Sequence, residues 1–350
     1  MRILILGASY GSLLSTKLLM AGHDVTLVCR DVTASLINSE GTQVRIKLRD
    51  EEDHRVIHSK DHPGNVNAAT PDDVKPGEYD MVCLAMQEPQ YSAGAVKTLM
   101  QRIAAAKVPC LSIMNMPPMP YLARIDSLKN VQLQAAYNDP SVWADFEPGL
   151  VSLCSPDPQA FRPPEEKANF LHVGLPTNFK AAIFENPAHN EMLRKLEADI
   201  LAVRLDGKDV PVKLRVFDSL FVPMAKWSML VTGNYRCVTE TSAVAIQDAV
   251  HGDIEKSKEM YAWVDLLART LGADSADQVP FDKYANAANG LLKPSSVARA
   301  IEAGVANVER VDKLVQLVGA SVGMQSDSVD AIVETLDARL AANSIASSAA

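Results

Sequence analysis

The sequence predicts an α/β protein in which a doubly wound parallel sheet is followed by a mainly helical domain. Short apolar segments alternate with helical stretches as far as Tyr137, and this alternation is typical of a parallel sheet covered by helices. From Asn190 onward the apolar spacing is almost wholly helical. The chain has 350 residues, and because domains usually contain about 100–200 residues, two domains are expected.

The first elements form a β-α-β unit. Arg2–Leu6 is short and apolar and ends at a glycine, which indicates a buried strand. Tyr10–Met20 has leucines at helical spacing, and Asp24–Cys29 is a second buried strand. A unit this short requires two parallel strands joined by a right-handed crossover.

Three further strands are expected before the pattern changes. They cover Asp80–Ala85, Val108–Met114 and Val131–Tyr137, with helices between them. A strand-rich stretch then runs to Val173, and residues 155–164 (SPDPQAFRPP) are typical of a loop near the domain junction.

The second half is expected to be helical. We predict a first domain over residues 1–185, a second over 186–343, and a frayed Ala/Ser-rich tail over 344–350. The expected helices are Asn190–Val203, Val212–Tyr235, Ser242–Leu271, Val297–Ala303, Val308–Val322 and Ser328–Ala342.

Composition excludes several classes of partner. The net charge is −9 without a run of Lys or Arg, which disfavours nucleic acids and anionic membranes as partners. No stretch reaches the roughly 18 apolar residues of a membrane span, and no signal peptide is expected. The five cysteines have neither CxxC nor metal-ligand spacing, so we predict reduced thiols, no metal site and a cytoplasmic protein. A monomer and a homodimer are both compatible with the sequence.

A glycine-containing turn joins the first strand to the first helix. Its sequence is Gly7-Ala8-Ser9-Tyr10-Gly11-Ser12. A dinucleotide requires a tight turn here and a helix N-terminus that faces the pyrophosphate, as in the Rossmann fold. The second glycine of the usual GxGxxG pattern is replaced by Ser9, and the last glycine comes one residue early. We predict that Gly7, Ser9, Tyr10 and Gly11 bind the cofactor; the alternative is an ordinary tight turn.

Arg30 follows the second strand. An enzyme that uses NAD typically has Asp or Glu there to bind the ribose 2′-hydroxyl, whereas a basic residue suits the 2′-phosphate of NADP. Arg30 therefore favours NADP(H). The alternative is a solvated charge at the strand end, and the adjacent Asp31 makes the pattern less clear.

The opening segment MRILILGASYGSLLSTKLLMAGHDVTLVCR resembles the N-terminus of the ketopantoate reductases. The resemblance implies an NADPH-dependent reductase of a 2-oxo acid, with a Rossmann domain and a helical domain like the C-terminal domain of 6-phosphogluconate dehydrogenase. In that family an arginine closes the second strand and holds the 2′-phosphate, and Arg30 matches it.

The resemblance also assigns residues in three other patches. Gln87, in LAMQEPQ, stands where the family has a lysine near the cofactor. Asn115, in IMNMPP, matches an asparagine that lies at both cofactor and substrate. In PSSVARAIEAGVANVERVD, Ser295 matches a serine that binds the substrate carboxylate, while Asn307 replaces the family's acidic residue and Glu309 stands at the following Asp position.

The family's proton-donating lysine is displaced. Aligned on Trp227, its position holds Met229, and the family's asparagine position holds Gly233. Lys226 lies one helical turn before Met229 on roughly the same face, and Asn234 follows Gly233. We therefore expect Lys226 to donate the proton, assisted by Asn234; the alternative is a surface lysine.

The predicted function is NADPH-dependent reduction of a 2-oxo acid or related carbonyl compound. Asn115, Ser295 and Asn307 would bind the small-molecule substrate, although Ser295 is also a good helix N-cap. Two alternatives stay open. One is an opine-type reductive condensation of an amine with a 2-oxo acid, with His251 as a possible acid. The other is a non-catalytic NADP-binding protein that has lost the family's lysine and glutamate.

Overall fold

A computed structural model describes residues 1–49 and 51–349, and the chain divides into two compact units. The sheet unit consists of Met1–Met86, Gln90–Leu122 and Ser141–Asp218. The helical unit consists of Gln87–Pro89, Ala123–Pro140 and Ser219–Ala350.

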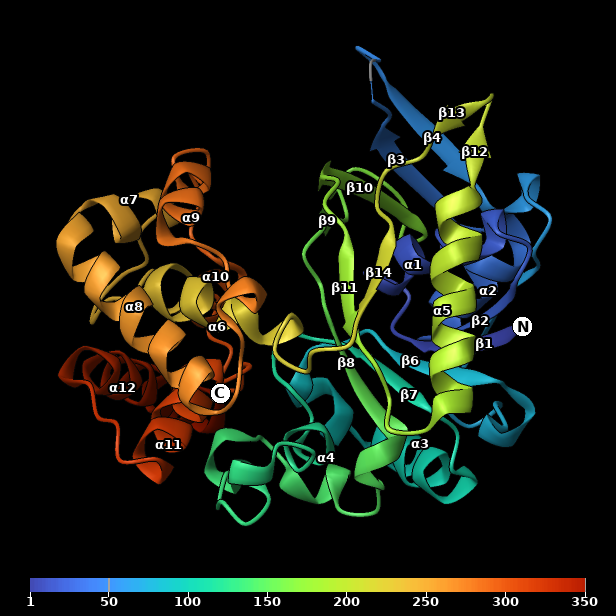
Figure 1. Cartoon of the computed structure of the whole chain (residues 1–350). Helices are drawn as coiled ribbons and strands as arrows, with labels where there is room; N and C mark the ends of the chain where they lie inside the picture. The colour runs from blue at the N-terminus through green and yellow to red at the C-terminus, as the bar shows by residue number, and fades with distance from the viewer. Residues whose placement is uncertain (50, 350) are drawn as a thin grey trace. The chain divides into compact units, whose positions relative to one another are not determined.

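The sheet unit is built on an eight-stranded sheet of order β14-β11-β8-β7-β6-β1-β2-β5 (Figure 1). All neighbouring strands are parallel except β8 and β11, which are antiparallel. The predicted α/β class with a parallel sheet is thereby confirmed. The strands are β1 (Arg2–Leu6), β2 (Asp24–Val28), β5 (Val66–Ala69), β6 (Met81–Leu84), β7 (Cys110–Ile113), β8 (Val151–Ser155), β11 (Phe179–Ala182) and β14 (Leu214–Phe217).

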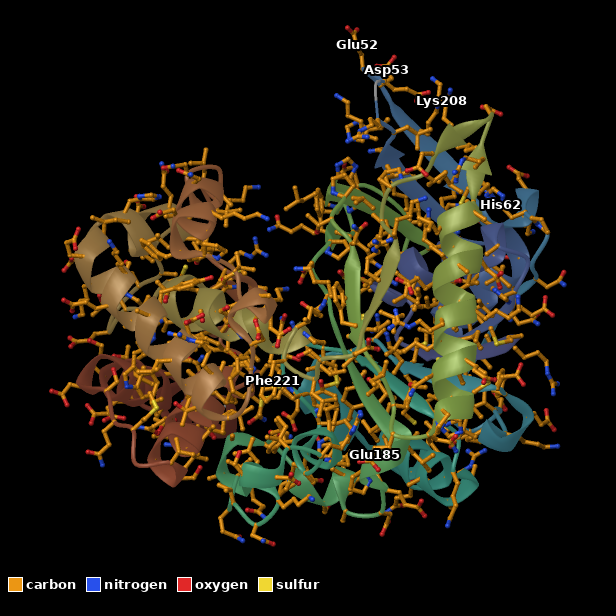
Figure 2. All side chains as sticks on the ribbon, viewed as in Figure 1. Glu52, Asp53, His62, Glu185, Lys208 and Phe221 are labelled. Atoms are coloured by element: carbon orange, nitrogen blue, oxygen red, sulfur yellow. The ribbon has the colours of Figure 1, made fainter. Side chains whose placement is uncertain are left out.

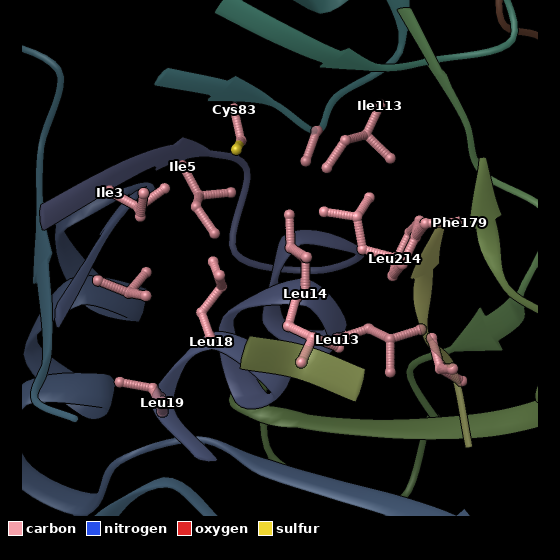
Figure 3. Packing of buried hydrophobic residues seen from close by; sticks show 14 of the residues in the cluster. Ile3, Ile5, Leu13, Leu14, Leu18, Leu19, Cys83, Ile113, Phe179 and Leu214 are labelled. Carbon is pink, nitrogen blue, oxygen red and sulfur yellow. The ribbon is translucent and has the colours of Figure 1, made fainter. Parts of the chain in front are cut away.

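Helices α1 (Gly11–Met20), α2 (Asp31–Glu40), α3 (Gly94–Ala106), α4 (Met119–Leu122) and α5 (Pro187–Ala202) complete this unit. Leu13, Leu14 and Leu18 of α1 pack against apolar side chains of the sheet, as Figure 3 shows. Burial of one such leucine contributes about 2 kcal/mol. This packing places the N-terminus of α1 at the carboxyl end of β1.

A second sheet of four strands has the order β4-β3-β10-β9. Its strands are β3 (Gln43–Lys47), β4 (His54–His58), β9 (Gln159–Phe161) and β10 (Phe170–Leu175). The segment 155–164, predicted to be a loop, thus contains β9, which pairs antiparallel with β10. A short hairpin of β12 (Arg204–Leu205) and β13 (Lys208–Asp209) lies near the β3–β4 tip, as the labelled Lys208, Glu52 and Asp53 show in Figure 2. The Lys208 Nζ donates a hydrogen bond to the Glu51 Oε1 at 2.6 Å.

The strand expected at Val131–Tyr137 is absent from the part of the chain that the structure describes. The segment has only a short 3-10 turn over Gln134–Ala136, in the helical unit. Leu133, Ala136 and Tyr137 are buried, and this spacing of three and four residues is that of a helical turn. β8 occupies the place beside β7 instead.

The predicted boundary at residue 185 falls inside the sheet unit. α5 contacts β14, and β14 pairs with β11, so the chain stays with the sheet as far as Asp218. The helix predicted over Val212–Tyr235 is wrong in its first part. In β14, Leu214 and Val216 are buried and Arg215 is exposed, which is the alternation of a strand.

The helical unit contains α6 (Lys226–Met229), α7 (Ile246–His251), α8 (Ile254–Thr270), α9 (Phe281–Ala288), α10 (Ser296–Glu302), α11 (Val311–Ser321) and α12 (Asp327–Ala349). The helix predicted over Ser242–Leu271 is divided, because Asp253 leaves the helical conformation and its side chain caps α8 at the Lys256 N–H. The expected tail is largely helical, since α12 continues to Ala349. None of the described helices is long and apolar enough to cross a membrane.

Candidate functional site

The turn between β1 and α1 leaves no room for side chains at its glycines. Gly7 has φ +103°, and a Cβ there would lie 2.7 Å from both the Ala85 carbonyl oxygen and the Met86 Cγ. A Cβ on Gly11 would lie 2.7 Å from the Ile5 Cγ2. The two glycines therefore permit close approach of the turn to β6 and of the helix to β1, as a dinucleotide turn requires.

The N-terminus of α1 lies at the carboxyl end of β1 and has no acidic residue in its first turn and no side-chain cap. The positive end of the helix dipole is consequently not neutralised by its own first turn, and Ser9 beside it is exposed. The geometry suits a pyrophosphate.

Tyr10 links this turn to the segment before β9. Its hydroxyl donates a hydrogen bond to the Pro158 carbonyl oxygen at 2.7 Å, and its ring meets the edge of Phe179 at a centroid distance of 5.9 Å. Burial raises the pKa of Tyr10 well above its ordinary value. The side chain thus holds two segments together, and a cofactor contact by Tyr10 remains a prediction.

Arg30 follows β2 and is exposed at the N-cap position of α2. Within the described residues its guanidinium has no hydrogen-bond or ion-pair partner. Since β1 and β2 are parallel, Arg30 lies at the same edge of the sheet as Gly7, whose N–H donates to the Val28 carbonyl at 3.0 Å. A free cation at this edge is suited to a phosphate.

Two other predicted cofactor residues follow strands of the same sheet. Gln87 comes after β6 and is exposed, and Asn115 comes after β7 and is half-buried between the buried Met114 and Met116. The carboxyl ends of β6 and β7 lie at one edge of the parallel sheet, and contacts of Gln87 and Asn115 with a cofactor stay predictions.

Lys226 and Asn234 lie in one irregular helical run of the helical unit. Lys226 begins α6, and Asn234 lies in a π-helix over Leu230–Tyr235; both are half-buried. π-helical turns frequently occur at functional sites, because they shift the side chains that follow. The sequence had no signal for this irregularity.

The hydroxyl of Ser295 has two partners within the helical unit. It accepts from the Ala298 N–H at 3.1 Å, which confirms the N-cap interpretation, and it donates to the Asn234 carbonyl at 2.6 Å. Ser295 is only 3% exposed. It therefore anchors α10 to the backbone of the π-helix, while its predicted contact with substrate stays untested. Asn307 is exposed in the loop before α11.

His251, the alternative acid, is half-buried and its Nε2 donates to the Ala285 carbonyl at 3.0 Å. This hydrogen bond gives the ring a structural role within the helical unit.

Sequence analysis missed a pair of buried carboxyl groups in the helical unit. Glu88 is 3% exposed and Glu309 is 6% exposed. Both carboxyl oxygens of Glu88 lie 3.2 Å from the Asn138 N–H, and the Glu88 N–H donates to the Glu309 Oε1 at 3.2 Å. The sequence signal for this pair was one of position: Glu88 directly follows Gln87, and Glu309 stands where the family pattern has Asp.

The environment of Glu88 favours its protonated form. Burial raises its pKa from 4.5 to about 7, the charges of Glu309 and Asp139 also raise it, and the N–H groups of Asn138 and Asp139 lower it. A carboxyl that titrates near neutrality can store or release a proton, so Glu88 is chemically able to act as an acid or a base.

No group of three or more His, Cys, Asp or Glu side chains within the described residues could hold a metal ion. The helical unit also has a cavity of about 190 Å³, lined by Trp263, Met324 and neighbouring residues of α8, α11 and α12. None of the predicted site residues lines it.

Comparison with known proteins identifies the fold. No family model and no curated protein sequence matches the chain. Three similar solved structures are as follows. D-mandelate dehydrogenase with NADH and anilino(oxo)acetate has TM-score 0.66 and 14% identity over 98% of this chain and 100% of that chain. 2-Dehydropantoate 2-reductase from Methylococcus capsulatus has TM-score 0.66 and 12% identity over 97% of this chain and 98% of that chain. Dimeric ketopantoate reductase from Staphylococcus aureus has TM-score 0.61 and 12% identity over 98% of this chain and 100% of that chain. The resemblance drawn from the first strand, turn and helix is thereby confirmed as a similarity of fold.

Proposed function

We propose that this protein, whose fold is that of the ketopantoate reductases and of D-mandelate dehydrogenase, is an NADPH-dependent reductase of a 2-oxo acid or related carbonyl compound. The observation that carries the proposal is the arrangement of Gly7, Gly11 and Arg30. Two glycines allow a dinucleotide to approach the start of α1, and the arginine that follows β2 has no side-chain partner among residues 1–49 and 51–349.

The nearest support for the substrate class comes from the neighbours. One of them is a D-mandelate dehydrogenase with NADH and anilino(oxo)acetate, and others are named 2-dehydropantoate 2-reductases. The D-mandelate dehydrogenase contains NADH, so the proposed preference of this protein for NADPH rests on Arg30.

Bound NADPH would supply a hydride to the carbonyl carbon of the substrate. Lys226 would donate the proton to the carbonyl oxygen, since an ammonium group is a competent acid when it is partly withdrawn from water. Asn115, Asn234, Ser295 and Asn307 would orient the substrate through their polar groups.

The experiment titrates the purified protein with NADPH and with NADH, following nicotinamide fluorescence, and then assays 2-oxo acids for oxidation of the preferred cofactor. Lys226→Met should lower kcat by about 10²-fold or more and leave the Kd for NADPH unchanged. Lys258→Met is the matched control, because Lys258 is exposed on α8. Equal activity of the two variants would exclude Lys226 as the acid.

The alternatives give different results. Turnover of an oxo acid only when an amine is added would identify the opine-type reaction, and NADPH binding without turnover of any oxo acid would identify a non-catalytic NADP-binding protein. We also propose a cytoplasmic protein, supported by the five free cysteines. Light scattering would decide between monomer and homodimer; one neighbour is dimeric.

A further inference from the structure

The cavity of about 190 Å³ in the helical unit is lined by residues of α8, α11 and α12, the helices labelled in Figure 1, and of the loop between α11 and α12. Its wall includes the apolar side chains of Trp263, Leu317 and Val329, and Asp330 of α12 also lines it. A cavity of about 150 Å³ can hold benzene, so this one has room for an aromatic ring with a short substituent.

The aromatic wall of the cavity is fixed by a glycine. A Cβ on Gly319 of α11 would lie 2.8 Å from the Trp263 Cη2 and 2.9 Å from the Met324 carbonyl oxygen. The indole therefore packs directly on the backbone of α11. The Met324 N–H donates a hydrogen bond to the Gly319 carbonyl at 2.9 Å, and the Met324 Sδ accepts one from the Thr270 hydroxyl at 3.7 Å. These contacts preorganise two lining residues, which lowers the cost of binding a ligand.

The charge in the lining of the cavity is negative. Asp330 supplies it, and among the described residues no Lys, Arg or His lines the cavity. The Asp330 Oδ1 accepts a hydrogen bond from the neutral Gln316 amide at 2.7 Å, and no ion pair joins Asp330 to another side chain within residues 1–49 and 51–349. Asp327 shares the first turn of α12, so two carboxylates share a helix dipole equivalent to about half a positive charge. The carboxylate of Asp330 is therefore suited to a cation.

We propose that this cavity binds a small organic ammonium compound, with its cationic group at Asp330 and its apolar part against Trp263 and Met324. A carboxylate stabilises an ammonium group by charge and by hydrogen bonds, tryptophan is the most favourable aromatic partner of a cation, and a thioether adapts to apolar ligands. An anion would be repelled by Asp330, and a bare metal ion would find a single carboxylate. The inference does not rest on the proposed reductase function.

The test titrates the full-length protein with benzylammonium chloride and with benzyl alcohol, a neutral compound of nearly the same size, at constant ionic strength. Tryptophan fluorescence reports binding. Trp263 is half-buried and lines the cavity, whereas Trp143 and Trp227 are 3% and 1% exposed, so a ligand from solvent reaches Trp263 first. Trp263→Phe identifies the source of the signal.

Two variants separate the charge that lines the cavity from other charges of the same helix end. Asp330→Asn removes the charge and keeps an oxygen that can accept the hydrogen bond from Gln316. The matched control is Asp327→Asn, because Asp327 lies in the same first turn, is exposed and does not line the cavity. Thermal denaturation of each variant verifies that it is folded.

We expect the wild type to bind benzylammonium saturably, and Asp330→Asn to weaken this binding by about tenfold. Benzyl alcohol should bind the wild type about tenfold more weakly than benzylammonium does, and should bind Asp330→Asn as it binds the wild type. Asp327→Asn should bind benzylammonium within about twofold of the wild type, since salt screens an exposed charge. Trp263→Phe should lose the fluorescence change.

Four results would overturn the inference. Equal affinity of the wild type for benzylammonium and benzyl alcohol would leave an apolar cavity without a cation site, and this comparison needs no variant. Unchanged binding in Asp330→Asn, or an equal loss in Asp330→Asn and Asp327→Asn, would refute the role of Asp330. A fluorescence change that persists in Trp263→Phe would place the ligand elsewhere. No saturable binding of benzylammonium to the wild type would refute the site itself.

Discussion

Replacing Glu88 by glutamine tests whether a buried carboxyl opposes folding at neutral pH. The side chain is 3% exposed, and its burial is the largest cause that raises the pKa from 4.5 to about 7. Glutamine has nearly the same shape, carries no charge, and its Oε1 can still accept a hydrogen bond from the Asn138 N–H, which lies 3.2 Å from the carboxyl oxygens of Glu88.

The direction of the effect follows from the two pKa values. Because the folded-state pKa is higher than the unfolded one, the folded protein binds this proton more tightly, and the free energy of unfolding falls as the pH rises from 4.5 through about 7. The interval between those values corresponds to about 3 kcal/mol. Glu309 faces the same site, so the titration belongs to the pair of carboxyls.

The assay is urea denaturation followed by circular dichroism at pH values of about 5 and about 8, which bracket the titration. Between the lower and the higher pH, the free energy of unfolding of Glu88→Gln should rise by up to about 3 kcal/mol relative to that of the wild type. Glu334→Gln, an exposed change on α12, should differ from the wild type by less than about 0.5 kcal/mol at both. A pH-independent difference for Glu88→Gln, or one that grows less favourable at higher pH, would refute the reasoning.

Three other changes test local features. Gly7→Ala should destabilise the protein by about 2 kcal/mol or more in thermal denaturation, because the new Cβ meets backbone at positive φ. The control is Gly77→Ala, because a Cβ on Gly77 meets no atom within 4 Å. Equal destabilisation by the two substitutions would contradict the prediction for Gly7. Ser295→Ala should lower the free energy of unfolding by about 1–2 kcal/mol, because it removes the helix cap and the hydrogen bond to the Asn234 carbonyl. The control is Ser296→Ala, since Ser296 is exposed. A raised KM without loss of stability would instead assign Ser295 to substrate binding. Burial and the neighbouring Lys213 lower the pKa of Lys17 from 10.5 to about 7, so wild-type stability should rise with pH between those values. In urea denaturation, the free energy of unfolding of Lys17→Met should not rise with pH in this range. The same pH dependence in Lys17→Met and in the wild type would contradict the prediction.

Local sequence patterns were sufficient to predict the fold of the first 30 residues of this protein. The apolar strands β1 and β2, the leucine spacing of α1 and the two glycines of the turn are properties of short segments, and the β-α-β unit has one favourable handedness. The position of Arg30 followed directly, because Arg30 lies just after β2, which ends at Val28, and is the N-cap residue of α2.

The tertiary structure alone decided contacts between distant segments. β14 joins the sheet by pairing with β11, so its strand conformation depends on a partner that its own sequence does not specify. The residues Glu88 and Glu309 are 221 positions apart, and the Tyr10 hydroxyl bonds to the carbonyl of Pro158, 148 positions further along the chain. Burial and the charge of neighbours set the chemistry of these groups, and both are properties of the folded chain rather than of any segment.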